Sequence, residues 1–95
     1  MQKDVREQES ALAANKEVVA LYRLWAQQEQ GTFGPSLAKC LVDLCAIHSD
    51  LDQPEEALAA GQEAAQLYRD LAGQDPQLFR LHLARTLTTL GALFG

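Results

Sequence analysis

Two cysteines and two histidines are the side chains of this 95-residue chain that could support nucleophilic catalysis or bind a metal. A thiol beside a histidine base would be a nucleophile, and Cys40 lies eight residues before His48. On one helix this spacing separates the two side chains by roughly 12 Å along the axis, beyond hydrogen-bond reach. Cys45 is turned about 140° from Cys40 around the same helix, too far for a disulfide or a shared metal. We expect both thiols to be reduced and His48 to be a packed core residue.

The remaining polar residues form no catalytic or cofactor motif. His82 stands alone, and we expect it to be solvated. The acidic pairs Glu55-Glu56 and Asp50/Asp52 are typical of helix starts, where the helix dipole favours negative charge. The chain has no glycine-rich phosphate loop, no His-Glu-x-x-His motif and no Cys-x-x-Cys pair. The sequence therefore predicts a protein that is not an enzyme and that uses no metal or cofactor.

Charge and composition weigh against several kinds of partner. The chain carries 8 basic and 13 acidic residues, which gives a formal net charge of −5 and a pI near 4.8. An acidic surface disfavours nucleic-acid phosphates and anionic membranes. No apolar run approaches the roughly 20 residues that span a bilayer, and the charged start, Met1–Asp4, does not look like a secretory signal. We expect a cytoplasmic protein that binds neither nucleic acid nor membrane.

The sequence repeats itself with an offset of 46 residues. Leu21-Tyr22-Arg23 returns as Leu67-Tyr68-Arg69, and Ala11–Ala14 returns as Ala57–Ala60. Aligning residues 2–49 with residues 48–95 gives 18 identical pairs out of 48. We therefore expect one domain, residues 1–95, made of two copies of a single unit, about 2–49 and 48–95.

Each unit contains two helical stretches. Leucine and alanine fill 31 of the 95 positions, which favours helix, and no segment alternates with the period of two that marks a strand. The first stretch is expected over Glu7–Gln30 and again over Pro54–Ala72. In the second copy Asp52 is the expected N-cap, with Glu55 completing a capping box, and Gly73 is the expected C′ residue.

Small and apolar residues follow one stripe of these first stretches, four and three positions apart. The stripes are Ala11, Asn15, Val18, Tyr22 and Trp25 in the first copy and Ala57, Gly61, Ala64, Tyr68 and Leu71 in the second. We expect the large side chains of both stripes, Tyr22, Trp25, Tyr68 and Leu71, to be buried between helix pairs. Truncation of Trp25 to alanine would then cost about 3–5 kcal/mol.

The second stretches begin at turns and carry stripes of leucine. Gly34-Pro35 is expected to open one stretch and Asp75-Pro76 the other, with Asp75 as N-cap. The stripes are Leu37, Leu41, Leu44, His48 and Leu51 in the first copy and Leu83, Leu87, Leu90 and Phe94 in the second. Alanines at positions 38, 46, 84 and 92 are small enough for neighbouring helices to approach closely. The predicted architecture is all-α, with about four helices stacked in pairs.

The residues where the two units join resemble the tetratricopeptide repeat. The pattern of that family runs from a bulky residue through Leu-Gly and an aromatic residue to Glu-Glu-Ala. The same order is followed by Leu41-x-x-Leu44-Cys45-x-x-His48 and then Pro54-Glu55-Glu56-Ala57. The pattern begins again at Leu87-x-x-Leu90-Gly91-x-x-Phe94. Cys45 replaces the usual glycine, His48 the usual aromatic residue and Gly61 a usual bulky residue. The period is 46 residues where the standard repeat has about 34.

The longer period makes the chain similar to the long repeats of kinesin light chains. The extra residues would lengthen both helices and the turn at Ala72–Phe79. The resemblance implies an α-solenoid fragment, with both ends falling inside a repeat, that serves as a scaffold for binding other proteins.

The same resemblance implies where a partner would bind. In that family the inner helices, which line a concave face, expose the positions that touch the ligand. Carried over to this chain, these positions are Lys39, Val42, Asp43 and Ala46 on one helix and Arg85, Thr88 and Thr89 on the next. Lys39 and Arg85 align across the units and would set two positive charges on an acidic body. Recognition of an acidic or C-terminal group of a protein or peptide partner by these two charges is the hypothesis that charge reversal at both would test. The carboxylate clamp of chaperone-binding members is not predicted, because Val42 and Ala46 stand where two of its ligands would be.

The alternative function is self-assembly. A solenoid normally ends in a polar capping helix, and the last leucine stripe is followed by none. The self-association residues would be Leu83, Leu87, Leu90 and Phe94, packed on a second chain. Burial of about 800 Å² per chain would make an interface of standard size, so we expect a homodimer or a higher oligomer.

Overall fold

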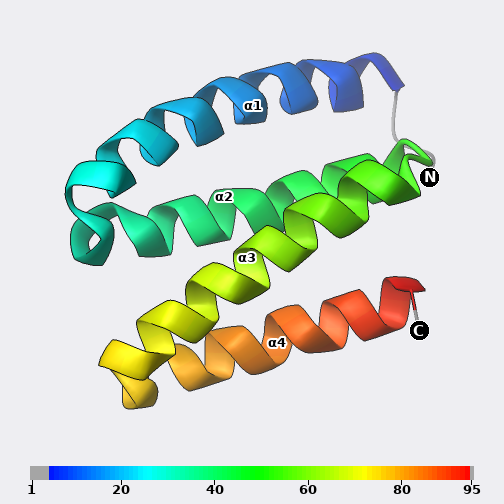
Figure 1. Ribbon diagram of the computed structural model, residues 1–95. Coiled ribbons are helices and arrows are strands. Elements are labelled where there is room, and N and C mark those ends of the chain that lie inside the picture. Colours follow the sequence, from blue (N-terminus) through cyan, green and yellow to red (C-terminus); the bar gives the residue numbers. More distant parts are fainter. Residues whose placement is uncertain (1–4, 95) are drawn as a thin grey trace.

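Residues 5–94 fold into four helices, each packed against the next (Figure 1). The computed structural model describes residues 5–94, with side chains from 6 to 92. In chain order the helices are α1 Val5–Gln28, α2 Gln30–Asp50, α3 Pro54–Gln74 and α4 Pro76–Phe94. No residue of the described range is in a strand, and the prediction of an all-α fold is confirmed.

A single residue joins the helices within each pair, so the expectation of a longer turn at Ala72–Phe79 is wrong. Glu29 connects α1 to α2 at φ −140° and ψ 79°, and Asp75 connects α3 to α4 at φ −140° and ψ 83°. Asp75 Oδ1 accepts a hydrogen bond from Leu78 N at 3.3 Å, which confirms Asp75 as the N-cap of α4. The two turns therefore have nearly the same backbone conformation and set each pair antiparallel.

Two expected helix boundaries are wrong. α2 begins at Gln30, so that Pro35 lies inside the helix and does not open it. The missing amide of Pro35 leaves the carbonyl of Gly31 without its helical donor, which is tolerated because Gly31 is exposed to water. Gly73 is not a C′ residue, because α3 continues to Gln74 and none of the described glycines has a positive φ.

A left-handed aspartate ends α2. Asp52 has φ 59°, Gln53 N donates to His48 O at 2.8 Å, and Asp52 N donates to Ser49 O at 3.1 Å. These two bonds form a Schellman motif with Asp52 in the C′ position. Asp52 therefore caps the end of α2, and the expectation that it caps the start of α3 is wrong. Gln53 is the N-cap residue of α3 and makes no side-chain hydrogen bond there.

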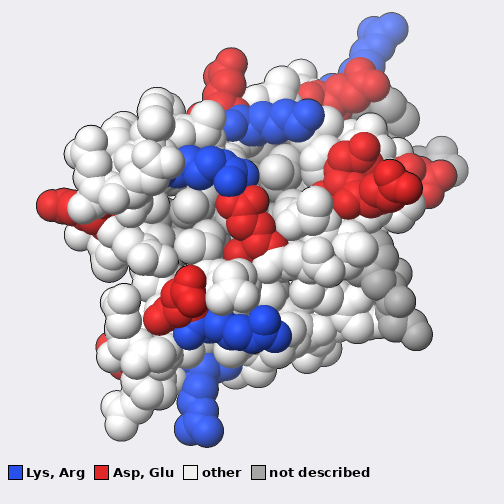
Figure 2. All heavy atoms as spheres, viewed as in Figure 1, with Lys and Arg blue, Asp and Glu red and all other residues white. Residues whose placement is uncertain are grey.

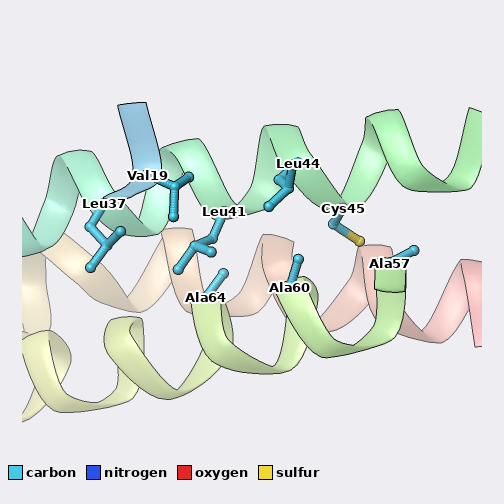
Figure 3. Close-up of a cluster of buried hydrophobic side chains, with 8 residues drawn as sticks. All are labelled: Val19, Leu37, Leu41, Leu44, Cys45, Ala57, Ala60 and Ala64. Atoms are coloured by element: carbon cyan, nitrogen blue, oxygen red, sulfur yellow. The ribbon is translucent and has the colours of Figure 1, made fainter. Parts of the chain in front are cut away.

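The main core lies between α2 and α3 and extends to α1 (Figure 3). Leucines of α2 point at alanines of α3, whose small side chains let the two helices approach closely. The cluster consists of Val19, Leu37, Leu41, Leu44, Cys45, Ala57, Ala60 and Ala64. A second cluster, which continues the core from α2 through α3 to α4, consists of Ala38, Tyr68, Leu71 and Phe79. The predicted stripe of α3 is thus confirmed as core, and so is that of α2 except for Leu51, which is half-buried and lies just beyond the end of the helix.

α1 is packed along its length only against α2. Trp25 is 43% exposed, whereas Leu71, its counterpart in α3, is 2% exposed. The expectation that Trp25 is buried is wrong because α3 lies between α2 and α4, and α1 has a helix on one side only. Trp25 packs instead on Tyr22, which is half-buried, and on Phe33, with ring centroids 5.6 and 5.4 Å away.

α4 also has a neighbour on one side only. Leu83 and Leu90 are half-buried and Leu87 is 40% exposed, while the side chain of Phe94 lies outside the described residues. Of the four alanines expected at close helix approaches, only the one at position 38 is buried, and those at 46, 84 and 92 are exposed. The close approach lies at Gly61, where an added Cβ would overlap the Leu90 side chain.

Candidate partner-binding site

α2 and α4 flank a hollow that has α3 beneath it; we call it the α2/α4 hollow. Its volume is about 270 Å³. Five of the seven predicted partner-binding residues line it, namely Lys39, Val42 and Asp43 from α2 and Arg85 and Thr89 from α4. The structure therefore places residues from helices about 46 positions apart at one surface.

The other two predicted residues, Ala46 and Thr88, do not line the hollow. Both are exposed. Ala46 lies one helical turn beyond Val42, and the Thr88 hydroxyl donates a hydrogen bond to Ala84 O at 2.9 Å. The hollow therefore brings together five of the seven predicted residues.

Tyr68 and His82 form an aromatic side of the α2/α4 hollow. Tyr68, from α3, is 5% exposed, and its ring stacks on the imidazole of His82 with centroids 5.4 Å apart and planes 13° from parallel. Burial and the nearby carboxylate of Asp43 raise the pKa of the Tyr68 hydroxyl. Tyr68 therefore stays neutral at physiological pH and offers a hydroxyl and a ring edge.

Sequence reasoning missed three residues of the lining. Tyr68 was expected only as core, and His82 as an isolated solvated residue. His82 and Thr86 share one helix face with Arg85 and Thr89, since they lie three, four and seven positions apart. That spacing could have predicted, within α4, that His82 and Thr86 lie on the same surface as Arg85 and Thr89. No sequence pattern indicated that Tyr68 of another helix would border the same hollow.

The charges of the α2/α4 hollow favour an anionic ligand. Lys39 and Arg85 are both exposed, and neither makes a salt bridge within the described residues. Asp43 is the one acidic residue of the lining. The hydroxyls of Thr86 and Thr89 donate to the carbonyls of His82 and Arg85 in their own helix, so their oxygens keep lone pairs that can accept a hydrogen bond.

The residues that could have supported catalysis are separated in the structure. His48 is buried, and its Nδ1 is hydrogen-bonded to the side-chain amide of Gln53, 2.7 Å from Oε1. Both cysteines are free thiols. Burial raises the pKa of Cys45, and burial together with Asp43 raises that of Cys40, so neither is an activated thiolate. His48 is a packed residue, as expected.

A larger hollow of about 460 Å³ lies between α1 and α2. Its cations are Lys16 and Arg23, with apolar contact from Leu24 and Leu44. Arg23 is already used, because its Nη2 donates to Oε1 of Glu63 in α3 at 3.0 Å. The α2/α4 hollow is the stronger candidate site, since neither Lys39 nor Arg85 forms a salt bridge in the part of the chain that the structure describes.

The described residues contain no group of three or more His, Cys, Asp or Glu placed to hold a metal ion. None of their helices is long and apolar enough to cross a membrane. On the face shown in Figure 2, basic and acidic side chains lie next to one another in small groups, without a large patch of one sign.

Comparison with known proteins finds no matching family model, no matching curated protein and no matching solved structure. The tetratricopeptide-like pattern therefore has the quoted residues as its only support. The described residues form a four-helix all-α domain in which each helix packs against the next one in the sequence.

Proposed function

We propose that this chain is a protein-interaction module, with a tetratricopeptide-like architecture, whose α2/α4 hollow binds an acidic or carboxylate group of a partner polypeptide. The observation that carries the proposal is the convergence of Lys39 and Arg85 on one hollow of a chain whose net charge is −5. Two unpaired cations on an otherwise acidic body are a local attraction for anionic groups.

The rest of the lining fits an extended polypeptide better than a small molecule. The volume of about 270 Å³ lies below the range of roughly 300–1,000 Å³ typical of small-molecule pockets. Val42 and Tyr68 offer apolar contact beside the cations, while Asp43 and the Thr89 oxygen can accept hydrogen bonds from peptide N–H groups. Such a mixed surface is typical of a polar, non-obligate interface.

A binding role is favoured over a catalytic one by the residue types of the lining. The hollow contains no cysteine or serine, the imidazole of His82 is stacked on Tyr68, and the hydroxyls of Thr86 and Thr89 donate to backbone carbonyls of their own helix and not to that imidazole. The Cys40 thiol is not part of the lining, and its raised pKa makes it a poor nucleophile.

The proposal is tested with a fluorescent Asp/Glu-rich peptide and its Asn/Gln counterpart of the same length. We expect the wild-type chain to prefer the acidic peptide, and Lys39→Glu with Arg85→Glu to raise its Kd more than tenfold. The matched control is Lys16→Glu with Arg80→Glu, which makes the same change in net charge outside the hollow. Equal affinity of the two double variants, or of the two peptides for wild type, would contradict the proposal.

A further inference from the structure

We propose that copies of this chain stack head to tail, with α4 and α3 of one copy covering α1 of the next. In this arrangement α4 and α3 of one copy lie on α1 of the next copy in the same way as α2 and α1 lie on α3 within one chain. This surface is separate from the α2/α4 hollow, and the proposal does not depend on the function proposed above. Three features carry it: an open face on α1, a matching face on α4, and two charged residues that the stacking would pair.

The open face of α1 repeats the face of α3 that α2 covers. Ala11, Ala14, Val18 and Trp25 are all exposed. Their counterparts 46 positions later are Ala57, Ala60, Ala64 and Leu71, with exposed fractions of 0, 6, 0 and 2%. Two of the three alanines that receive the leucines of α2 therefore recur on α1, as Ala11 and Ala14, while Val18 stands at the position of Ala64, and no described helix covers them.

α4 carries the leucines that match this face. Within the chain, Leu37, Leu41 and Leu44 of α2 pack on the alanines of α3 (Figure 3). The corresponding residues of α4 are Leu83, Leu87 and Leu90. Leu87 is 40% exposed where Leu41 is 1% exposed, so the central leucine of the α4 face lacks the cover that its counterpart has.

The small residue needed at the closest approach is also supplied, on the other helix. Within the chain, an added Cβ at Gly61 of α3 would lie 3.3 Å from Cys45 Sγ of α2. The corresponding pair between copies is Asn15 of α1 and Gly91 of α4. Gly91 has open space around its Cα, with nothing within 4 Å of an added Cβ. Asn15 is half-buried and its Nδ2 donates a hydrogen bond to Cys40 O of α2 at 3.3 Å, so its side chain is held toward α2 of its own chain, and the open space at Gly91 is what leaves room for a close approach between copies.

Charge complementarity favours a second copy as the occupant. Within the chain, the guanidinium of Arg23 on α1 forms a two-pronged ion pair with Glu63 on α3. The same two residue types recur with the offset of 46, as Arg69 on α3 and Glu17 on α1. Both are exposed, and neither forms a salt bridge within the described residues. Head-to-tail stacking places Arg69 of one copy opposite Glu17 of the next, which repeats the internal ion pair.

Such a contact joins two different surfaces, so each added copy exposes a fresh α4 and a fresh α1. Head-to-tail stacking therefore produces assemblies whose size grows with concentration, unless the rotation that relates successive copies closes them into a ring. Sedimentation of the wild-type chain from about 1 μM to 1 mM at physiological salt should show a mass that rises with concentration.

Charge exchange tests the register. Arg69→Glu and Glu17→Arg should each raise the concentration of half-association about tenfold, because each sets like charges face to face. An equimolar mixture of the two variants should associate as wild type does, since every contact in an alternating stack then pairs opposite charges. The double variant Arg69→Glu/Glu17→Arg should do the same. The matched control Lys16→Glu changes a cation on the other side of α1 and should leave association unchanged.

Trp25 gives an independent readout, because it is the only tryptophan and lies on the open face. Its emission should shift to shorter wavelength as the chain associates. Circular dichroism establishes that each variant keeps its helices. The proposal is overturned by a wild-type chain that stays monomeric at 1 mM, by charge variants that associate like wild type, by a mixture that does not recover, or by association without a change in Trp25 emission.

Discussion

At the scale of single residues, Gly61 determines how closely three helices approach. An added Cβ there would overlap the side chain of Leu90 on α4 and lie 3.3 Å from Cys45 Sγ on α2. We expect Gly61→Ala to lower the free energy of unfolding by about 1–2 kcal/mol, since crowding outweighs the helix propensity that alanine gains. Urea unfolding followed by circular dichroism measures the change.

Gly73 is the matched control in the same helix. It is exposed and has nothing within 4 Å of an added Cβ. Gly73→Ala should therefore stabilise the chain by about 0.5–1 kcal/mol through helix propensity alone. If the two substitutions changed stability by the same amount, Gly61 would not be a point of close packing.

The two thiols should differ in reactivity. Cys40 is half-buried and Cys45 is 2% exposed. Because burial raises both pKa values, and Asp43 adds to the increase at Cys40, alkylation should be slower than in the unfolded chain. Mass spectrometry after iodoacetamide treatment should find Cys40 modified first. Faster labelling of Cys45, or rates equal to those in urea, would contradict the burial.

The raised thiol pKa values also fix the sign of the alkaline pH dependence. A folded-state pKa above the unfolded value means that the unfolded chain loses its protons first. The free energy of unfolding is unaffected below the unfolded pKa of roughly 8.5 and falls as pH rises above it. Cys45→Ala removes one of the two thiols, so urea unfolding at a series of pH values should show a smaller fall in the free energy of unfolding above about pH 8.5 than wild type shows.

At the scale of the helices, the sequence predicted periodicity better than boundaries. The starts of α3 and α4 at Pro54 and Pro76 follow from proline in the first turn, and both are confirmed. The C-terminus of α2 could not be predicted, because aspartate both favours N-caps and tolerates a left-handed backbone, and Asp52 takes the second role. Pro35 misled in the same way, since its local preference for a helix start yields to the turn at Glu29.

Periodicity also does not reveal how many neighbours a helix has. The stripe of α1 was predicted as core by its spacing, yet only α2 packs along α1. We therefore expect Trp25→Ala to cost about 1 kcal/mol, well below the 3–5 kcal/mol of a buried aromatic residue. Leu41→Ala, at a position 1% exposed, should cost about 3 kcal/mol. Equal losses for the two variants, measured by thermal unfolding at low protein concentration, would place Trp25 in the core.

At the scale of the whole molecule, the candidate site depends on contacts that no local pattern contains. Lys39 and Arg85 occupy equivalent positions in the two copies of the 46-residue repeat, which the sequence shows, and the structure brings both to one hollow. The contribution of Tyr68 arises only because α3 lies between α2 and α4. The same sandwich arrangement buries α2 and α3 on two sides and leaves α1 and α4 with one packed side each.

This arrangement predicts an uneven distribution of local stability. Helices with two neighbours open only when most of the core is lost, whereas α1 and α4 can separate from one neighbour each. In native-state hydrogen exchange at low micromolar concentration, we expect amides of α2 and α3 to exchange most slowly and those of α1 and α4 to exchange earlier. Raising the concentration should then protect α1 and α4 selectively if copies stack head to tail. Uniform protection of all four helices at low concentration would show that the chain unfolds as one unit and that its outer helices are as well supported as its central pair.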